Sequence, residues 1–195
     1  MWEAAIGSYC NILEGHFSYI NAVAFSPDGQ LVAFVSNDAV RVWEAAIGSC
    51  CSVLEGHTSI VNAVTFSPDG QLVASASYNG TVQLWEAAIG SYCNVLEGHF
   101  SYINAVAFSL DGQLVASVSN DAMQVWEAAI RSYRNMFEGY ISFVNAVVFS
   151  LDSQLVASAS NNGTVRLWEA ATGSYRNIFE SYIFIVNIIV FSPNG

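Results

Sequence analysis

The chain has 195 residues, and its 16 acidic side chains against five arginines give a formal net charge of -11. Clustered cations bind phosphate backbones, so this charge argues against nucleic acid as a direct partner. Only 11% of the residues are charged while 53% are apolar, which are low and high values for a soluble domain and predict an adhesive surface.

No stretch reaches the roughly 18 uninterrupted apolar residues that a membrane helix needs, so we expect no membrane insertion. The start Met1-Trp2-Glu3 lacks the basic and apolar regions of a signal peptide, and we expect a cytoplasmic, intracellular protein. Cys10, Cys51 and Cys93 occupy the same place in successive repeat units. Equivalent places on neighbouring units exceed the ~7 Å Cα separation that a disulfide allows, so we expect free thiols.

A Trp-Glu pair recurs in steps of 41 or 42 residues, at Trp2, Trp43, Trp85, Trp126 and Trp168. Each unit contains segments with the composition of short strands. In the first unit these are an outer strand at Ser8–Leu13, an inner strand at Ile20–Phe25, a middle strand at Leu31–Ser36 and a third strand at Val40–Trp43. The inner strand is almost wholly apolar, which indicates burial on both faces.

The turns between these strands are equally informative. In Ser26–Gly29, between the inner and middle strands, Pro and Gly supply the backbone angles of a hairpin turn. The 41-residue units lack one residue in the turn before Trp. Because a strand slip would move apolar side chains to the wrong face, we expect the turn to absorb this deletion. The units that start at Trp2 and Trp85 are nearly identical, but Phe34 in the first replaces Ser117 in the third.

The second unit carries five motifs in a fixed order: Gly56-His57, the turn Ser67–Gly70, the run Leu72–Ser75, the turn Tyr78–Thr81 and the closing Trp85-Glu86. At this period they resemble the WD40 repeat, with Glu in place of the Asp of the usual dipeptide. The segments LEGH, FSPDGQLVAS and LWEAA are most similar to segments in the WD40 arrays of fungal NACHT-type signalling proteins of the vegetative-incompatibility group.

The resemblance implies an all-β fold, an incomplete WD40 β-propeller over residues 1–195. We expect four full four-stranded blades, about 17–54, 58–96, 100–137 and 141–179, with an N-terminal outer strand and a C-terminal inner strand in a partial blade at 183–195. A typical ring has seven such blades and needs roughly 290 residues. The chain is therefore expected to be a fragment, a truncated product or one part of an assembly.

The resemblance also implies a buried, hydrogen-bonded tetrad of His, Ser or Thr, Asp and Trp in each blade. Carried over position by position, the sets are His16, Ser36, Asp38 and Trp43; His57, Ser77, Asn79 and Trp85; His99, Ser119, Asp121 and Trp126; and Tyr140, Ser160, Asn162 and Trp168. The first and third sets are complete. In the second and fourth sets, where Asn replaces Asp, the charge-assisted link is expected to be weaker or absent.

Catalytic interpretations of the same residues are unfavourable. A hydrolase triad needs an exposed nucleophile, an oxyanion hole and a pocket, and a single copy suffices, whereas these residues repeat. Cys10 and His16 lack the paired spacing of zinc ligands. No glycine-rich phosphate-binding motif is present. We therefore expect no enzyme activity, no metal and no cofactor.

In WD40 rings the functional face usually carries the loops after Gly-His and the turns before Trp. The corresponding residues here are Tyr19, Asn21, Ile60, Asn62, Tyr78, Tyr102, Asn104, Phe143 and Asn145. Two interpretations remain open. These aromatics and amides form a protein-binding patch, or they only pack between blades of a decaying repeat.

The predicted function is a non-catalytic scaffold for protein-protein interaction. The first choice is the sensor portion of a fungal incompatibility-type signalling protein. A WD40 adaptor, for example in organelle fission or in a ubiquitin ligase, is the second. A decayed fragment without independent function is the third, favoured by Tyr140 in place of His and by Ser153 in place of the turn Gly.

An open arc of blades exposes two apolar sheet faces, more apolar surface than soluble monomers usually leave uncovered. The run Tyr182–Phe191 carries no charge and adds a sheet edge prone to association. The expected partners are other proteins or peptides, further WD40 blades, or a second copy in an eight-bladed ring. A monomer whose ends meet is the remaining alternative.

Overall fold

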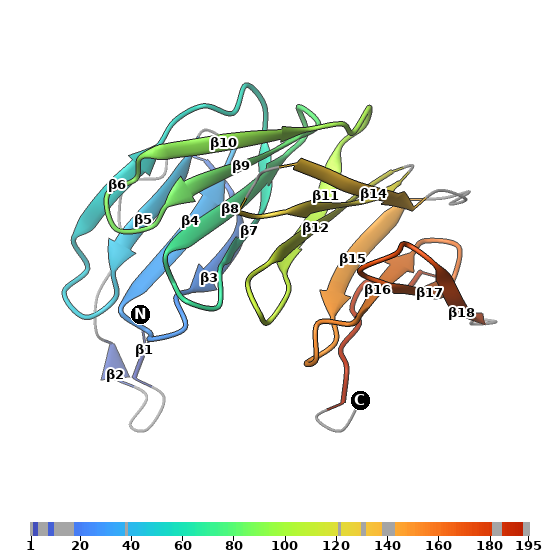
Figure 1. The fold of residues 1–195 in the computed structure, drawn as a ribbon. Helices are drawn as coiled ribbons and strands as arrows, with labels where there is room; N and C mark the ends of the chain where they lie inside the picture. The colour runs from blue at the N-terminus through green and yellow to red at the C-terminus, as the bar shows by residue number, and fades with distance from the viewer. Residues whose placement is uncertain are drawn as a thin grey trace.

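The computed structural model describes residues 2–3, 8–9, 18–37, 39–120, 122–129, 132–137, 143–180 and 185–192. Within these residues the regular structure is entirely β. Four antiparallel sheets of four strands stand beside one another in an arc, with a two-stranded hairpin apart from them (Figure 1). The expected incomplete propeller of four blades is therefore confirmed. The described residues contain no helix that could span a bilayer.

The small hairpin pairs β1 (Trp2–Glu3) with β2 (Ser8–Tyr9). Blade 1 consists of β3 (Ile20–Phe25), β4 (Leu31–Ser36), β5 (Val40–Glu44) and β6 (Cys50–Leu54). Blade 2 consists of β7 (Val61–Phe66), β8 (Leu72–Ser77), β9 (Thr81–Glu86) and β10 (Tyr92–Glu97). Blade 3 consists of β11 (Ile103–Phe108), β12 (Leu114–Ser119), β13 (Met123–Glu127) and β14 (Ser132–Phe137). Blade 4 consists of β15 (Val144–Phe149), β16 (Leu155–Ser160), β17 (Thr164–Glu169) and β18 (Tyr175–Glu180).

The turn between the first two strands of a blade is built by its own polar side chains. In blade 1 the Ser26 hydroxyl donates to Asp28 Oδ1 at 2.6 Å, and the Gln30 amide donates to the same oxygen at 3.0 Å. Hydrogen bonds to the ionised form lower the pKa of Asp28, the Ser26 hydroxyl contributing most and the Gln30 amide next. Gly29 adopts φ +71°, which L-residues rarely take, so the turn chemistry of the sequence accounts for this hairpin.

The shorter turn of blade 1 leaves the strand register unchanged. Val32 pairs with Trp43 in blade 1, and Val73 pairs with Trp85 in blade 2, although the second pair is one residue further apart in sequence. The Ser36 amide donates to the Ala39 carbonyl at 3.1 Å across the shorter turn. The prediction that the turn absorbs the deletion is confirmed, because a register slip would have turned Trp43 to the opposite face.

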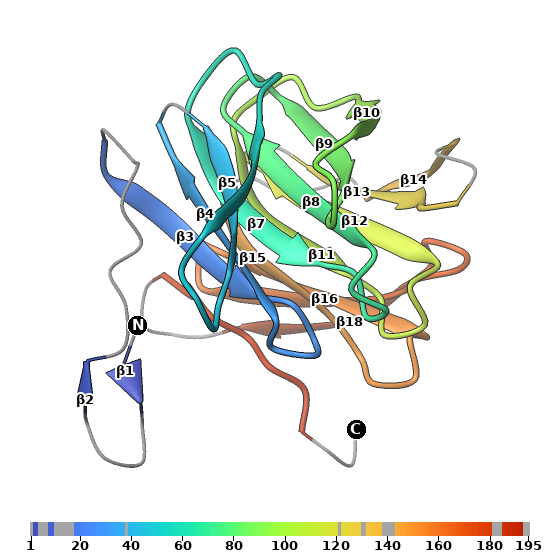
Figure 2. The ribbon, with the colours of Figure 1, turned by 90° about the vertical axis from the view of Figure 1, so that its left-hand side faces the viewer.

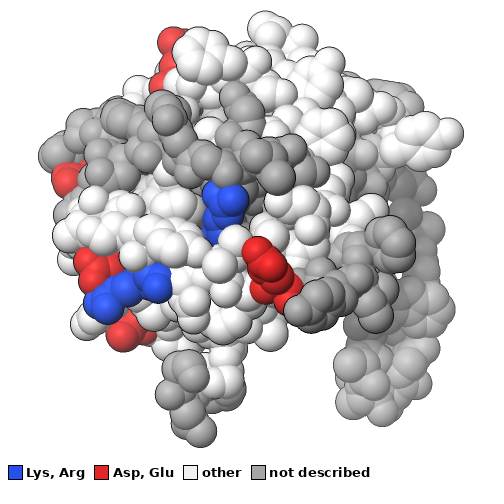
Figure 3. All heavy atoms as spheres, turned by 90° about the vertical axis from the view of Figure 1, so that its right-hand side faces the viewer, with Lys and Arg blue, Asp and Glu red and all other residues white. Residues whose placement is uncertain are grey.

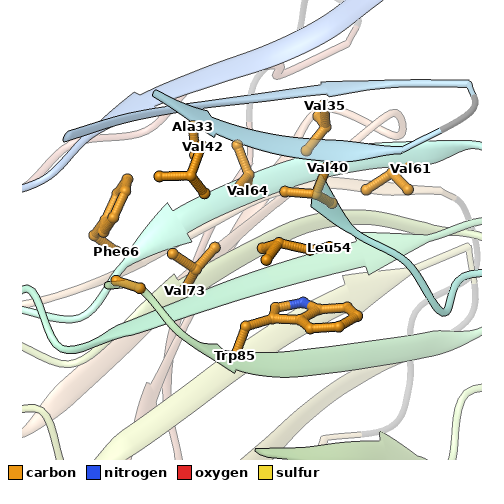
Figure 4. Close-up of a cluster of buried hydrophobic side chains, with 11 residues drawn as sticks. Ala33, Val35, Val40, Val42, Leu54, Val61, Val64, Phe66, Val73 and Trp85 are labelled. Carbon is orange, nitrogen blue, oxygen red and sulfur yellow. The ribbon is translucent and has the colours of Figure 1, made fainter. Parts of the chain in front are cut away.

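The core lies between blades. In the first of three interfaces, Val35, Val40 and Val42 of blade 1 pack in one cluster with Val64, Phe66 and Trp85 of blade 2 (Figure 4). Two further clusters join blade 2 to blade 3 and blade 3 to blade 4. Each fully buried side chain of this size contributes about 1.5–3 kcal/mol. The apolar side chains buried between blades therefore stabilise each blade against its neighbours.

The inner strands β3, β7, β11 and β15 lie next to one another in chain order, and the blades fan out around them (Figures 1 and 2). Beyond blade 4, residues 185–192 occupy the place of a further inner strand. The Val186 amide donates to the Ser160 carbonyl at 3.2 Å, and Asn145 Nδ2 donates to the Val186 carbonyl at 3.3 Å. This segment follows the path predicted for the C-terminal inner strand, but its described residues form no strand, so that part of the prediction is wrong.

Candidate protein-binding face

The ends of the blades at which the inner strands begin form one face of the arc, here called the upper face. Tyr19, Tyr102 and Phe143 directly precede β3, β11 and β15. Their exposed fractions are 84%, 54% and 52%. Ile60 has the same place before β7 and is half-buried. Three of the four predicted contact positions therefore present large apolar side chains to solvent on the same face.

Tyr78 completes an aromatic platform on the upper face. It follows β8 in the turn of blade 2, where its amide donates to the Ile60 carbonyl at 2.9 Å. Its ring stacks on Tyr102 of the next unit, with ring centroids 4.7 Å apart and planes at 24°. Such an offset stack adds about 0.5–1.5 kcal/mol beyond burial. The stack holds two aromatic rings of neighbouring blades in one orientation.

Phe100 lies in the loop before Tyr102 and is 94% exposed. The sequence analysis did not single it out, although its place directly after the Gly-His pair is a loop position that the family uses for binding. The sequence does offer a signal for Phe100: an aromatic residue stands at a loop position where the second unit has Thr58. Phe100 is therefore an exposed aromatic residue in the loop that leads to Tyr102.

The predicted amides have a structural role on this face. Asn21 Nδ2 donates to the Val61 carbonyl at 2.8 Å, and Asn104 Nδ2 donates to the Val144 carbonyl at 2.8 Å, each reaching the next blade. Asn62 and Asn145 make the same kind of bond, to the carbonyls of Asn104 and Val186. The interpretation of these residues as contacts between blades therefore holds for the amides. The aromatic side chains on the same face are instead exposed to solvent.

Beneath the upper face, blade 2 contains a continuous hydrogen-bonded chain. Trp85 Nε1 donates to Ser75 Oγ at 2.9 Å, and Ser75 Oγ lies 2.8 Å from His57 Nε2. On the other side of the ring, His57 Nδ1 lies 3.4 Å from Thr81 Oγ1, whose hydroxyl donates to Asn79 Oδ1 at 2.7 Å. One arrangement of protons satisfies every link: a neutral imidazole with its proton on Nδ1.

The serine of this chain differs from the predicted one. His57 bonds Ser75, not Ser77, and in blade 3 His99 Nε2 lies 2.7 Å from Ser117 Oγ, not Ser119. Both serines of a strand lie on the same face because they are two residues apart. Ser75 is level with the indole nitrogen, whereas Ser77 lies one step nearer the turn, where its hydroxyl donates to the Ser59 carbonyl at 3.1 Å.

Blade 1 lacks this serine altogether. Phe34 occupies the position of Ser75, and its ring meets Trp43 edge-to-face with centroids 5.2 Å apart. The predicted Ser36 instead donates to the Ala39 carbonyl at 3.3 Å. The position whose serine bonds the histidine in blades 2 and 3 thus carries an aromatic side chain here, and the tetrad of His16, Ser36, Asp38 and Trp43 stays a prediction. His16 and Asp38 lie outside the described residues.

The remaining tetrad residues are placed as follows. His99 is 8% exposed and meets Trp126 edge-to-face at 5.8 Å, while Asp121 lies outside the described residues. In blade 4 the Ser160 hydroxyl donates to the Phe143 carbonyl at 2.9 Å, as Ser77 donates to the Ser59 carbonyl in blade 2. Asn162 Oδ1 accepts the Thr164 hydroxyl at 2.6 Å, and Trp168 packs between Phe137 and Tyr175. Tyr140 lies outside the described residues.

Burial lowers the pKa of His57 to about 4, and the weaker opposing causes are its hydrogen bonds to Asn79 and Ser75. The ring is therefore neutral at pH 7, as the hydrogen-bonded chain requires. Ser75 and Ser117 are fully buried, so no substrate reaches either hydroxyl. Among the described residues, no group of three or more His, Cys, Asp or Glu side chains is placed to hold a metal ion. Cys51 and Cys93 are free thiols.

The fold and this face define a class of protein: a repeat scaffold whose four-stranded blades present side chains on a common face. The family model of the WD domain, G-beta repeat, matches residues 7–44, 48–86, 90–127 and 131–169. The chain belongs to the WD40 repeat family. Members of this family generally serve as non-catalytic scaffolds for protein-protein interaction. No curated protein matches the chain. The matches 48–86, 90–127 and 131–169 each start with the outer strand of one blade and end in the third strand of the next, so these sequence repeats each span two blades.

Proposed function

We propose that the upper face binds a peptide segment of another protein, with the stacked Tyr78 and Tyr102 as its centre. The observation that carries this proposal is the stack itself, at 4.7 Å, with the almost fully exposed Phe100 two residues before Tyr102 in the chain. Rigid aromatic side chains dominate the binding energy of protein interfaces because they bury a large area and lose little conformational entropy.

The scaffold beneath supports this role. The Asn104 side chain donates to Asn120 Oδ1 at 3.0 Å and to the Val144 carbonyl at 2.8 Å, so the start of β11, next to Tyr102, is fixed in two directions. A preorganised surface loses less entropy on binding. The net charge of -11 favours a basic segment as the ligand, since Arg and Lys are attracted to aromatic faces as well as to negative charge.

Three finer assignments belong to the same proposal. The amino-acid sequence of the repeats supports the assignment of this chain to the sensor portion of a fungal incompatibility-type signalling protein. The alternative assignment is a cytoplasmic WD40 adaptor. A decayed repeat without independent function is supported by one observation, Ser153 at φ +60° in a turn where blades 1 to 3 have Gly. A free partner-binding face distinguishes the first two from the third.

The test is selection of peptides from a displayed library against the full chain, followed by affinity measurements for variants. Tyr102→Ala should weaken binding of a selected peptide at least about tenfold, as expected for an interface hot spot. Ile89→Ala is the matched control, because Ile89 is 69% exposed but lies in the turn after β9, at the other end of the blade. Selection of no peptide, or equal loss with both variants, would refute the proposed binding face.

A further inference from the structure

The interface between neighbouring blades has two unlike halves. On one side stand a Val and a Phe of an inner strand: Val64 and Phe66 are only 9% and 7% exposed. On the other side stand small residues of the preceding inner strand, Ala22 and Ala24, which pack against the cluster containing that Val and Phe. Because the repeat preserves these positions, every blade offers a Val-Phe half in one direction and a small-residue half in the other.

The same pairing recurs along the chain. In the second interface Ala63 packs against the cluster that contains Val106, with Phe108 at its edge. In the third, Ala105 and Ala107 pack against the cluster that contains Phe149. Ile189 and Phe191 continue the series on blade 4. Together with Val190, Leu155, Leu167 and Phe179 they line an apolar cavity of about 420 Å³.

One half of this interface is uncovered at each end of the arc. At the N-terminal end, Val23 and Phe25 of β3 are each 53% exposed, although their equivalents in blade 2 are buried. At the C-terminal end, Ile188 and Val190 occupy the positions of Ala22 and Ala24 and are 80% and 83% exposed. On the described part of this end of the arc most of the surface is uncharged, with Arg and Asp or Glu side chains among it (Figure 3).

We propose that the C-terminal half-interface of one copy of this chain binds the N-terminal half-interface of a second copy, with Ile188 and Val190 against Val23 and Phe25. The occupant follows from continuity with the interface that the chain already builds three times. The amide series points to the same arrangement, since Asn145 donates to the Val186 carbonyl. The same rule predicts that the side-chain amide of Asn187, the next in the series, donates to the Ile20 carbonyl of the second copy.

The contact is heterologous, because two different surfaces meet. Such a contact forms a closed ring when the rotation between copies completes a circle, and a filament otherwise. None of the four contacting side chains is charged, whereas each copy carries a net charge of -11. Salt therefore strengthens the association by screening the repulsion between copies.

The test is light scattering during size-exclusion chromatography of the full chain and of two exposed-residue variants, Val23→Lys and Val190→Asp. Each variant alone should be monomeric where the unsubstituted chain associates, since a charge buried without a partner weakens association about a hundredfold or more. An equimolar mixture of the two should associate again, because Lys of one copy then meets Asp of the other. Ile47→Lys, at a 65% exposed site in the turn after β5, is the control and should associate normally.

Circular dichroism of both variants confirms that they are folded, as expected for substitutions at exposed positions. A monomeric unsubstituted chain at every salt concentration would overturn the proposal. So would a monomer caused by Val190→Asp with no effect of Val23→Lys, because that result indicates two C-terminal segments pairing with each other. Filaments that both variants block support the contact and show that the ring does not close. Variants of the upper face, such as Tyr102→Ala, leave the association unchanged.

Discussion

Blades 1 and 2 share the register that pairs the tryptophan with a valine of the second strand, yet they fill the space beside their tryptophans in opposite ways. In blade 2, Ser75 and His57 form a polar chain with Trp85. In blade 1, Phe34 stands where Ser75 would be and packs edge-to-face on Trp43. Both tryptophans are 1% exposed. The burial of Trp in register therefore defines the blade, and the polar chain is one of two ways to achieve it.

The polar chain of blade 2 and the aromatic contact of blade 1 differ in how strongly each depends on the surrounding side chains. A buried polar chain stabilises the blade only when every member is satisfied, because an orphaned member costs its full desolvation. An aromatic contact tolerates small changes and carries no proton. The blades should therefore differ in their response to substitution and to pH, which four predictions test in order of expected effect.

The largest effect is expected when the side chain of blade 1 is placed in blade 2. Ser75→Phe should destabilise the chain by about 4 kcal/mol, because the new ring overlaps the His57 imidazole and both hydrogen bonds of Ser75 are lost. Urea denaturation measures the change. Adding His57→Ala should recover part of it by removing the overlap. A cost below about 1 kcal/mol for Ser75→Phe would show that the two blades offer the same space.

Acid should destabilise blade 2 through His57. The folded pKa of about 4 lies below the usual 6.5, so the unfolded chain binds a proton in this range while the folded chain does not. Stability is therefore full above pH 6.5 and falls by about 3 kcal/mol as the pH drops to 4. Unfolding measured against pH should show this loss, and His57→Gln should remove it. An identical pH profile in the His57→Gln variant would contradict the assignment of a buried, neutral imidazole.

The two serines of β8 should contribute unequally. Ser75→Ala should cost about 2 kcal/mol, since it leaves Trp85 Nε1 and His57 Nε2 without their shared partner, and Ser77→Ala about 1 kcal/mol. In double-mutant cycles with His57→Ala, the Ser75 pair should show coupling and the Ser77 pair none. Coupling confined to Ser77 would restore the assignment made from the sequence.

The smallest effect concerns blades 3 and 4. Ser153 adopts φ +60° where Gly112 of blade 3 has φ +72°. Ser153→Gly should stabilise the chain by about 0.5 kcal/mol, the difference between relieved strain and the greater entropy of the unfolded chain. The gain is small because Ser153 Oγ also accepts the Asp111 amide at 3.1 Å. Thermal melting measures the shift. Gly112→Ser, the reverse change, should lower the melting temperature, and a rise there would remove backbone strain from the explanation.

Much of the fold was predictable because its signals are local. The strands Ile20–Phe25 and Leu31–Ser36 have the predicted bounds, since Ser26, Asp28 and Gly29 specify the turn between them through bonds within a few residues. The missing residue before Trp43 was also assignable to the turn, because a slip of register would have exposed the tryptophan. The protein-binding role of the aromatics and the fungal signalling assignment stay predictions.

The sequence by itself determined the repeat, the class of fold and the bounds of the strands Ile20–Phe25 and Leu31–Ser36, because period, alternation and turn residues act within a single unit. The tertiary structure alone decided that Ser75 rather than Ser77 meets His57, that Asn104 holds the next blade, and that Tyr78 stacks on Tyr102. Each of these contacts joins different strands or neighbouring blades. Two serines on one face of a strand are about 7 Å apart, and only the packing of the strands around them selects the one that meets the imidazole.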